Sequence, residues 1–339
     1  MSGKLIFRVN GNNEIGLGHL YRCLALAELV KSKFECIFVT EAIPESLVLQ
    51  ITDSYRYFKV HEENDFLLYD DLLEKGDVII LDGYKFDYYY QIRLRSFEVK
   101  LVIIDDFVAL NYSADVIINH GISNSCGYNS VINDLCKVYT GFEHVILRKV
   151  FLEQTFIHKT IESINTLFIC MGGADPFQLT QKALNSALKS RQFRRIIVVT
   201  GAAFNFNSTF RDLISKSCLE IEVSHYHNIS DSIMAKLMGQ AQIAICPSST
   251  ISLEACCIRM GLLTGYGIDN QRAIHNQLIE RECAISVGDL NDITEDKLIH
   301  AIKKLSRVDV VRKLISNQKE IFDGLSSKRN FEIFSELAI

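Results

Sequence analysis

One histidine follows a glycine-containing loop at the point where an expected strand gives way to an expected helix. The segment Gly11–His19 reads GNNEIGLGH, with Gly16 and Gly18 just before the histidine. Glycines let a backbone approach a ligand closely, and the amino end of a helix favours an anion. His19 would lie in the first helical turn, where it could act as a general base or simply bond to backbone. The loop lacks the GKS or GKT of a Walker motif and the third glycine of a G-x-G-x-x-G motif.

Two later strand-to-helix transitions carry groups suited to a phosphate. The first is Gly172-Gly173-Ala174-Asp175-Pro176, in which Asp175 is expected to cap a helix that begins at the proline. The second is Ser249-Thr250, where hydroxyls and free N–H groups suit a diphosphate. Glu254, one turn later, could accept hydrogen bonds from a ribose diol. The simpler interpretations are a tight turn that needs glycines and an ordinary capping box.

Composition limits the function classes. The 339 residues predict about two domains with substantial cores. Lys and Arg number 36 and Asp and Glu 41, so the net charge is −5. The absence of a basic excess predicts no nucleic-acid partner, because binding to the phosphate backbone depends on clustered cations. A bound anion would instead be held by local positive potential, such as that of backbone N–H groups at helix starts.

The cysteines and the amino terminus indicate the compartment. The first apolar run, Leu5–Phe7, ends at Arg8 and is too short for a signal sequence, and we find no run long enough to span a membrane. We therefore expect a cytoplasmic protein with no membrane insertion. Ten cysteines occur without a C-x-x-C pair, and most lie within apolar runs. They are expected to be reduced, buried thiols, with no metal site and no cofactor.

Apolar runs alternate with helical patterns, which is typical of parallel strands buried on both faces by helices. One series of runs occupies the first half of the chain and a second begins at residue 166. The sequence predicts an α/β fold of two Rossmann-like domains, residues 1–158 and 159–339, that face a cleft, with the last helix able to pack back on the first domain. The expected strands are Leu5–Val9, Cys36–Val39, Val78–Leu81, Leu101–Ile104 and Val116–Ile118, then Thr166–Cys170, Ile196–Thr200, Ile221–Ser224, Ile243–Cys246, Leu262–Tyr266 and Ala284–Val287.

Taken in order, these segments resemble one enzyme family. Gly11–Ala27 resembles the opening of the UDP-2,4-diacetamido-2,4,6-trideoxy-β-L-altropyranose hydrolases of pseudaminic acid biosynthesis, the PseG family, which are relatives of the MurG-like GT-B glycosyltransferases. Similar segments follow along residues 5–290. They are Asp82-Gly83-Tyr84, Ile104-Asp105-Asp106, Ala114–Asn119, Gly141–Phe151, Gly172–Pro176 with Leu179-Thr180, Ile233–Met238, Ser249–Glu254 and Asp269-Asn270-Gln271.

The resemblance implies a metal-independent, inverting hydrolase. Water would attack the anomeric carbon of a UDP-linked 2,4-diacetamido-2,4,6-trideoxyhexose, break the C1–O bond and release UDP and the free sugar. His19 matches the family's proposed base and Tyr84 a tyrosine near the sugar. The substrate-binding residues expected in this chain are Gly16, Gly18, Arg22, Asp82, Gly172, Gly173, Asp175, Ser249, Thr250, Glu254, Asn270 and Gln271. Residues 159–339 would form the UDP-binding domain.

The chain departs from the family pattern before the serine–threonine pair. Cys246-Pro247-Ser248 stands where the family usually has A-G-G, and Leu253-Glu254 where W-E is common. Two alternatives to a hydrolase remain open. One is a GT-B glycosyltransferase that passes the sugar of a UDP-sugar to an acceptor, and the other is a non-catalytic nucleotide-sugar-binding protein. His19 and Tyr84 argue against the second alternative.

Overall fold

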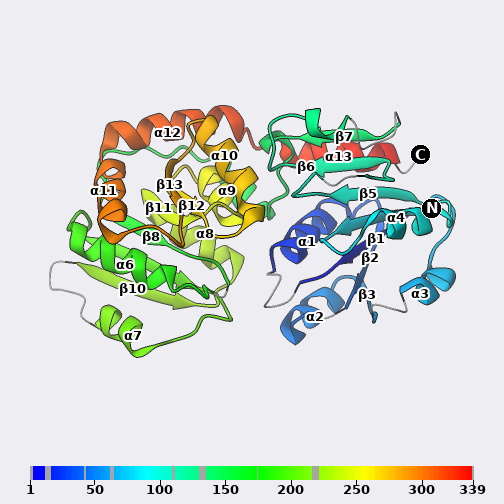
Figure 1. Ribbon diagram of the computed structural model, residues 1–339, viewed down its shortest axis with the longest axis horizontal. Coiled ribbons are helices and arrows are strands. Elements are labelled where there is room, and N and C mark those ends of the chain that lie inside the picture. The colour runs from blue at the N-terminus through cyan, green and yellow to red at the C-terminus, as the bar shows by residue number, and fades with distance from the viewer. Residues whose placement is uncertain are drawn as a thin grey trace. The chain divides into compact units, whose positions relative to one another are not determined.

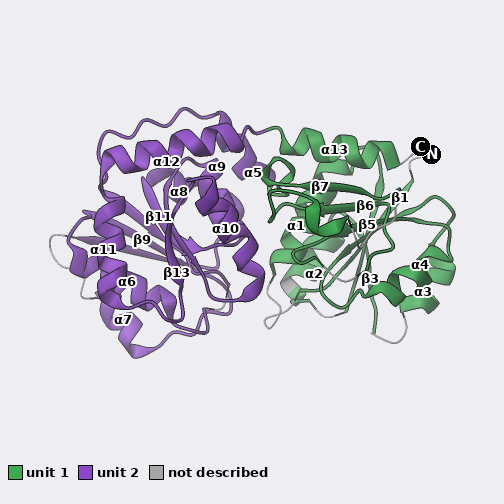
Figure 2. Ribbon diagram, turned by 45° about the horizontal axis from the view of Figure 1, so that its top comes forward, with its two compact units in different colours: residues 1–148, 325–339 green, residues 149–324 purple. Residues whose placement is uncertain are grey.

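Contacts within the chain define two compact units. The computed structural model describes residues 3–11, 17–41, 43–61, 65–108, 111–129, 135–173, 175–215 and 221–337. Unit 1 comprises residues 1–148 and 325–339, and unit 2 comprises residues 149–324 (Figure 2). The division differs from the predicted limit at residues 158 and 159 in two segments, 149–158 and 325–339, and that domain limit stays a prediction.

Unit 1 is built on a parallel sheet, which contains seven strands among the described residues. Its order is β3-β2-β1-β4-β5-β6-β7, so β1 and β4 are neighbours although β2 and β3 come between them in the chain. The strands are β1 (Lys4–Val9), β2 (Glu35–Thr40), β3 (Arg56–Lys59), β4 (Val78–Asp82), β5 (Lys100–Ile104), β6 (Val116–Asn119) and β7 (Lys137–Thr140). The central strands are mainly apolar because both faces of the sheet are covered, with Arg8 of β1 and Asp82 of β4 as buried charged exceptions.

Helices cover both faces of this sheet (Figure 1). Alternate residues of β1 enter separate cores, Leu5 and Phe7 on one face and Ile6 on the other. Phe334 of the last helix joins the first of these cores, so the carboxyl-terminal helix packs on unit 1. The helices of unit 1 are α1 (Gly18–Val30), α2 (Glu45–Thr52), α3 (Asp65–Leu72), α4 (Tyr88–Arg95) and α13 (Ser326–Leu337).

Unit 2 repeats this plan with a six-stranded parallel sheet in its described residues. The order is β10-β9-β8-β11-β12-β13, which makes β8 and β11 the central neighbours. The strands are β8 (Thr166–Ile169), β9 (Arg195–Thr200), β10 (Glu222–His227), β11 (Ile243–Pro247), β12 (Gly261–Tyr266) and β13 (Ile285–Asp289).

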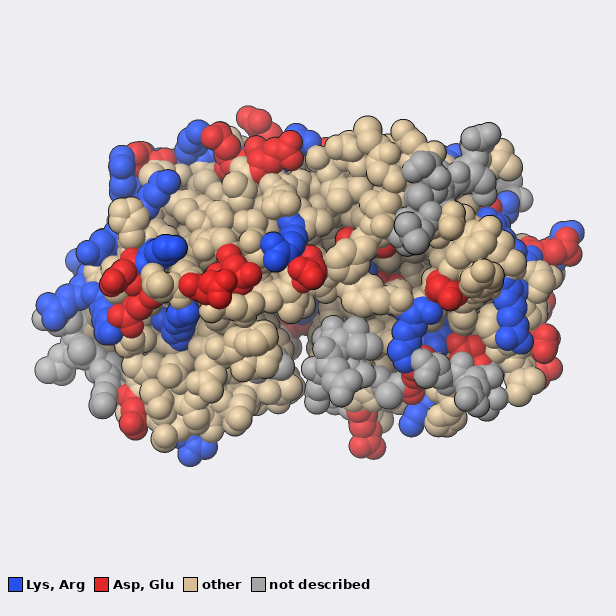
Figure 3. All heavy atoms as spheres, in the orientation of Figure 1, with Lys and Arg blue, Asp and Glu red and all other residues tan. Residues whose placement is uncertain are grey.

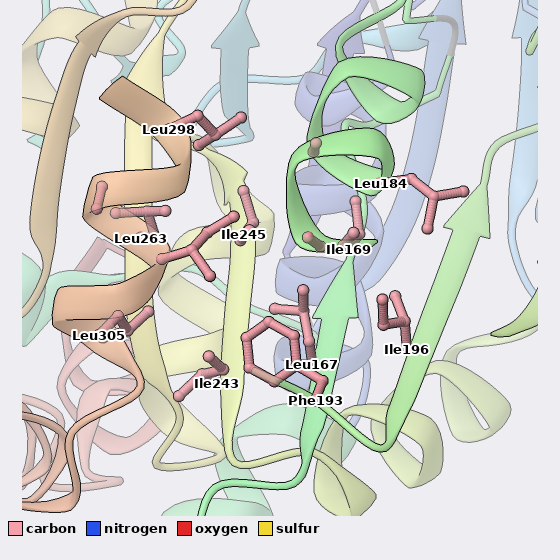
Figure 4. Packing of buried hydrophobic residues seen from close by; sticks show 14 of the residues in the cluster. Leu167, Ile169, Leu184, Phe193, Ile196, Ile243, Ile245, Leu263, Leu298 and Leu305 are labelled. Carbon is pink, nitrogen blue, oxygen red and sulfur yellow. The ribbon is translucent and has the colours of Figure 1, made fainter. Parts of the chain in front are cut away.

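The core of unit 2 interlocks strand and helix side chains. Figure 4 shows Ile169 and Ile245 of neighbouring strands beside Leu184 of α6 and Leu298 of α11. All four are 3% exposed or less. The helices of unit 2 are α5 (Lys149–Leu152), α6 (Leu179–Ser190), α7 (Ser208–Ser215), α8 (Asp231–Gln240), α9 (Thr250–Cys257), α10 (Arg272–Glu280), α11 (Glu295–Leu305) and α12 (Val308–Ile321). The predicted α/β class with two parallel sheets is confirmed.

One predicted helix start is wrong. The helix expected to begin at Pro176 begins at Leu179 instead, after Asp175 and Gln178 adopt positive φ angles of 48° and 54°. Asp175 nevertheless caps it, because its carboxylate accepts the backbone N–H groups of Leu179 and Thr180 at 2.8 and 2.7 Å. The residues between Asp175 and Leu179, including Pro176, form a turn that precedes the helix, and the Asp175 carboxylate spans this turn to reach the helix start.

Candidate functional site

The topology of unit 1 brings the predicted base to a strand junction. In both sheets the chain builds strands to one side of a central strand and then returns to its other side, and ligands of such sheets bind at the carboxyl ends of the strands where this reversal occurs. In unit 1 that point lies between β1 and β4. His19 is the second residue of α1, and Asp82 is the last residue of β4. The two side chains meet there and are almost fully buried.

Asp82 orients the His19 ring. Its Oδ1 lies 2.6 Å from His19 Nδ1, and a carboxylate can only accept, so Nδ1 carries the proton. Arg22 Nη2 also lies 3.0 Å from Nδ1. However, Nη2 itself lies 2.5 Å from Asp82 Oδ1 and 3.2 Å from Asp106 Oδ2, so both of its hydrogens are directed to carboxylates. In the neutral ring with its proton on Nδ1, Nε2 is therefore the atom that can accept a proton.

Arg22 holds two carboxylates in place. Its Nε donates to Asp82 Oδ2 at 2.6 Å and its Nη1 to Asp106 Oδ1 at 2.7 Å. Burial alone would raise the pKa of Asp82, but Arg22 and His19 lower it well below its usual value. Burial would likewise raise the pKa of Asp106, but Arg22 holds it below its usual value. Both groups are thus carboxylates beside the base. Arg22 and Asp82 were expected to bind substrate, and that role stays a prediction.

Tyr84 links the buried pair to the surface. Its ring makes an edge contact with the His19 ring at 4.9 Å between centroids, and its hydroxyl donates to Asp106 Oδ2 at 3.1 Å. The side chain is 51% exposed, in contrast to His19 at 4%. The predicted catalytic pair, His19 and Tyr84, therefore lies together in unit 1. Gly18 is the exposed first residue of α1, and Gly16 lies outside the described residues.

The sequence interpretation missed two residues of this cluster. Asp106 was noted only as part of a motif, although it bonds both Arg22 and Tyr84. His120 follows β6 and is buried, and burial together with the Arg22 cation lowers its pKa to about 4. His120 carried no spacing signal, because its position depends on the parallel pairing of β5 and β6.

In unit 2 the glycine pair makes a close backbone approach. Gly172 has a φ of 92°, which favours glycine. A Cβ on Gly201, at the end of β9, would collide with the backbone of Gly173. Position 201 therefore needs a glycine so that the backbone after β9 can pass close to Gly173. The carboxylate of Asp175 is engaged in capping α6, and a role for it in substrate binding stays a prediction.

The start of α9 lies at the corresponding junction of unit 2, after β11. Ser249 is the residue before the helix and Thr250 its first residue, and both are partly exposed. Glu254 lies one turn into the helix with 1% of its side chain exposed. The structure thus places the serine–threonine pair at the amino end of a helix, where the backbone favours an anion.

A buried polar network lies beneath this loop. Ser248 Oγ lies 2.9 Å from Thr264 Oγ1 and 2.9 Å from His275 Nδ1, and His275 Nε2 lies 3.0 Å from Ser286 Oγ. Thr264 donates its own proton to the Cys246 carbonyl at 2.8 Å. The Ser248 hydroxyl therefore donates to either Thr264 or His275, and the loop is fixed from below. Sequence interpretation noted Ser248 only as a departure and missed His275.

Asn270 and Gln271 lie in a short 3-10 helix, Asp269–Gln271, after β12. The side-chain oxygen of Gln271 accepts the backbone N–H of Gly267 at 2.8 Å, so this amide shapes its own loop. Both side chains are partly buried. Their contacts with substrate stay a prediction.

The described part of the chain was expected to lack a metal site, a membrane span and a basic stripe, and those expectations stay predictions. The described residues contain no group of three or more His, Cys, Asp or Glu side chains arranged to hold a metal ion. None of the described helices combines the length and apolarity needed to cross a bilayer. On the face shown in Figure 3, basic and acidic side chains are interspersed rather than gathered into a basic stripe. Nine described cysteines are free thiols, seven of them buried.

Three curated proteins are similar in sequence, whereas no family model matches the chain. The hydrolase of UDP-2,4-diacetamido-2,4,6-trideoxy-β-L-altropyranose from Campylobacter jejuni is 23% identical over 82% of this chain and 97% of its own. The spore coat polysaccharide biosynthesis protein SpsG of Bacillus subtilis is 24% identical over 88% of this chain and 87% of its own. The uncharacterized protein MJ1062 of Methanocaldococcus jannaschii is 27% identical over 88% of this chain, which spans 62% of that longer protein.

Solved glycosyltransferase structures share the fold. MurG of Acinetobacter baumannii matches with a TM-score of 0.66 at 12% identity, over 98% of this chain and 99% of its own. Phytolacca americana UGT2, solved with UDP-2-fluoro-glucose and pterostilbene, matches with a TM-score of 0.67 at 11% identity, over 99% and 100%. The chain therefore has the two α/β domains of GT-B glycosyltransferases and is related in sequence to a UDP-diacetamido-trideoxy-altropyranose hydrolase, as its motifs predicted.

Proposed function

We propose that this protein hydrolyses a UDP-linked 2,4-diacetamido-2,4,6-trideoxyhexose at the anomeric C1–O bond. The observation that carries the proposal is the bond between His19 Nδ1 and Asp82, 2.6 Å long, which leaves Nε2 of the neutral ring as the basic atom. The sequence relationship to the C. jejuni hydrolase supports the choice of substrate class. The free sugar would serve nonulosonic acid synthesis, such as that of pseudaminic acid.

The reaction needs one activated water. His19 Nε2 takes a proton from water as the water oxygen bonds to C1 on the face opposite UDP. The C1–O bond breaks with its electron pair going to UDP, and the anomeric centre inverts. Asp82 stabilises the imidazolium that forms. UDP is a good leaving group, so the chemistry asks more for a base and charge stabilisation than for an acid.

We assign the binding of UDP to residues of unit 2. The Ser249-Thr250 start of α9 presents backbone N–H groups and hydroxyls of a kind that bind a diphosphate. Glu254 is proposed to accept hydrogen bonds from the ribose, and Gly172 and Gly173 to let their loop approach the ligand. No metal is required by this scheme, so turnover should persist in EDTA.

The test is to incubate the protein with a panel of UDP-sugars and follow the products by NMR. The expected result is UDP plus a free diacetamido sugar of inverted configuration. His19→Asn should abolish turnover and still bind UDP, whereas Glu254→Ala should weaken UDP binding in calorimetry. Full turnover by His19→Asn would reject the proposed base.

A glycosyltransferase is the second candidate, because the solved structures that share the fold carry that activity in their names. The NMR assay separates the two. A hydrolase releases free sugar without an added acceptor, and a transferase consumes UDP-sugar only when an acceptor is present.

A further inference from the structure

An exposed apolar wall stands beside the His19 cluster. Tyr84, Phe107 and Val108 are 51%, 43% and 41% exposed. The Tyr84 ring lies 5.5 Å from the Phe107 ring and 4.9 Å from the His19 ring, measured between centroids. Single exposed apolar side chains are ordinary, but two exposed aromatic rings in contact next to a candidate base indicate a binding surface.

The backbone of Phe107 lies against polar groups of nearby residues. The backbone N–H of Phe107 donates to Asp105 Oδ1 at 3.1 Å. The Tyr112 hydroxyl lies 2.8 Å from the Phe107 carbonyl oxygen and 2.7 Å from Asp105 Oδ2. Tyr128 also donates to that carboxylate oxygen at 2.5 Å. The Phe107 N–H is thus held by Asp105, its carbonyl oxygen lies within hydrogen-bond distance of Tyr112, and its side chain is presented from an ordered backbone position.

Val108 follows Phe107 in the chain and is also partly exposed. Its side chain packs over Gly127, where an added Cβ would lie 3.2 Å from Val108 Cγ2. Burying these side chains in the protein core would stabilise the fold, yet the loop holds them outward. A fixed apolar surface beside a base fits the apolar edge of the molecule on which the base acts.

We propose that Phe107, together with Tyr84 and Val108, binds the apolar edge of the substrate sugar, formed by its 6-methyl and acetamido methyl groups, and thereby selects 6-deoxy diacetamido sugars over sugars with a polar 6-hydroxymethyl group. This inference rests on the proposed function and adds a specificity surface to it. Discrimination arises because a hydroxyl placed against Phe107 would lose its hydration without gaining a partner.

The first test compares three UDP-sugars, namely UDP-2,4-diacetamido-2,4,6-trideoxyhexose, UDP-2-acetamido-2,6-dideoxyglucose and UDP-N-acetylglucosamine. Phe107→Ala should raise KM for the first sugar about 10-fold, leave kcat within about 3-fold, and reduce its preference over the third by a similar factor. The second sugar separates the contribution of the 6-methyl group from that of the 4-acetamido group. Unchanged selectivity in Phe107→Ala would overturn the inference.

The matched control is Tyr89→Ala. Tyr89 is an aromatic residue of α4 in the same unit, 81% exposed, and it contacts Tyr88 rather than the His19 cluster. Its removal should change neither KM nor selectivity. An equal effect of both substitutions would show a general loss of surface order and would also count against Phe107.

A second test does not depend on turnover. The chain contains no tryptophan, so Phe107→Trp introduces a single fluorophore at the wall. In a His19→Asn background its emission should shift with the UDP-diacetamido sugar and not with UDP alone, and Tyr89→Trp should respond to neither. Absence of hydrolysis by the wild-type protein would reject the proposed function, and a Phe107→Trp variant that responds to none of the UDP-sugars would reject the wall.

Discussion

At the scale of single residues, the function of His19 depends on Asp82. The carboxylate is fully buried and accepts from His19, from Arg22 and, at 3.4 Å, from the thiol of Cys23. Its negative charge is what would stabilise the His19 imidazolium during turnover. A neutral amide keeps the shape of this group and loses that charge.

Asp82→Asn is therefore expected to lower kcat by at least about 100-fold, the lower range of a general base's contribution. UDP affinity should stay unchanged, because the nucleotide is assigned to unit 2. Steady-state kinetics and calorimetry measure the two quantities. Cys23→Ala is the matched control, since it removes only a weak thiol donor to the same carboxylate. Equal kcat values for the two variants would contradict the orienting role of Asp82.

His120 makes stability depend on pH. Burial and Arg22 lower the pKa of His120 to about 4 from its ordinary value of 6.5, and Asp106 and Asp82 oppose them only in part. Between those values the unfolded chain binds the proton more strongly, so the free energy of unfolding falls as the pH falls.

The expected loss is about 2 kcal/mol between pH 7 and pH 5, and His120→Gln should remove that part of the pH dependence. Urea unfolding of both proteins at the two pH values provides the comparison. Other histidines, such as the half-buried His144 in unit 1, also have lowered pKa values and contribute a slope of their own. An unchanged slope in His120→Gln would show that His120 is not buried as the neutral form.

At the scale of elements, the sequence predicted those strands that have a local apolar pattern. Apolar runs predicted the central strands of both sheets because parallel strands covered on both faces must be apolar. The edge strands β3, RYFK, and β7, KVYT, were not predicted, since half-exposed strands keep polar residues. The contacts of Arg22 with Asp106 and of Ser248 with His275 span 84 and 27 residues, a separation that no local pattern reveals.

The Ser248–His275 contact carries a prediction about the α9 loop. Burial lowers the pKa of His275, with Arg272 contributing, so the ring is a neutral bridge between Ser248 and the exposed Ser286. An asparagine amide can replace Nδ1, which faces Ser248, and a glutamine amide can replace Nε2, which faces Ser286.

His275→Asn should therefore keep UDP affinity within about 3-fold, and His275→Gln and Ser248→Ala should weaken it about 10-fold, the equivalent of one buried hydrogen bond. Calorimetry with UDP measures all three. Ser286→Ala is the control and should resemble wild type. If the asparagine and glutamine variants bind UDP equally well, the network does not position this loop.

At the scale of the whole molecule, unit 1 is formed by two separate segments, residues 1–148 and 325–339, and unit 2 by the single segment 149–324 between them. The two ends of that single segment lie close together within unit 2. An added Cβ on Gly324 would collide with Thr155 Oγ1, and the φ of 79° there also favours glycine. Each unit has its own apolar core, so each is expected to open separately.

Phe334 in α13 is the place to test that independence. The side chain is fully buried in the core of unit 1, against α1. Phe334→Ala should destabilise unit 1 by about 3–5 kcal/mol, the usual cost of such a cavity. Hydrogen exchange should then accelerate in β1 and β4 and stay unchanged in β8 and β11. Phe331→Ala, at a partly buried position on the same helix, should have a smaller effect. Equal acceleration in both sheets would mean that the units unfold as one, and the last helix would then stabilise the entire chain.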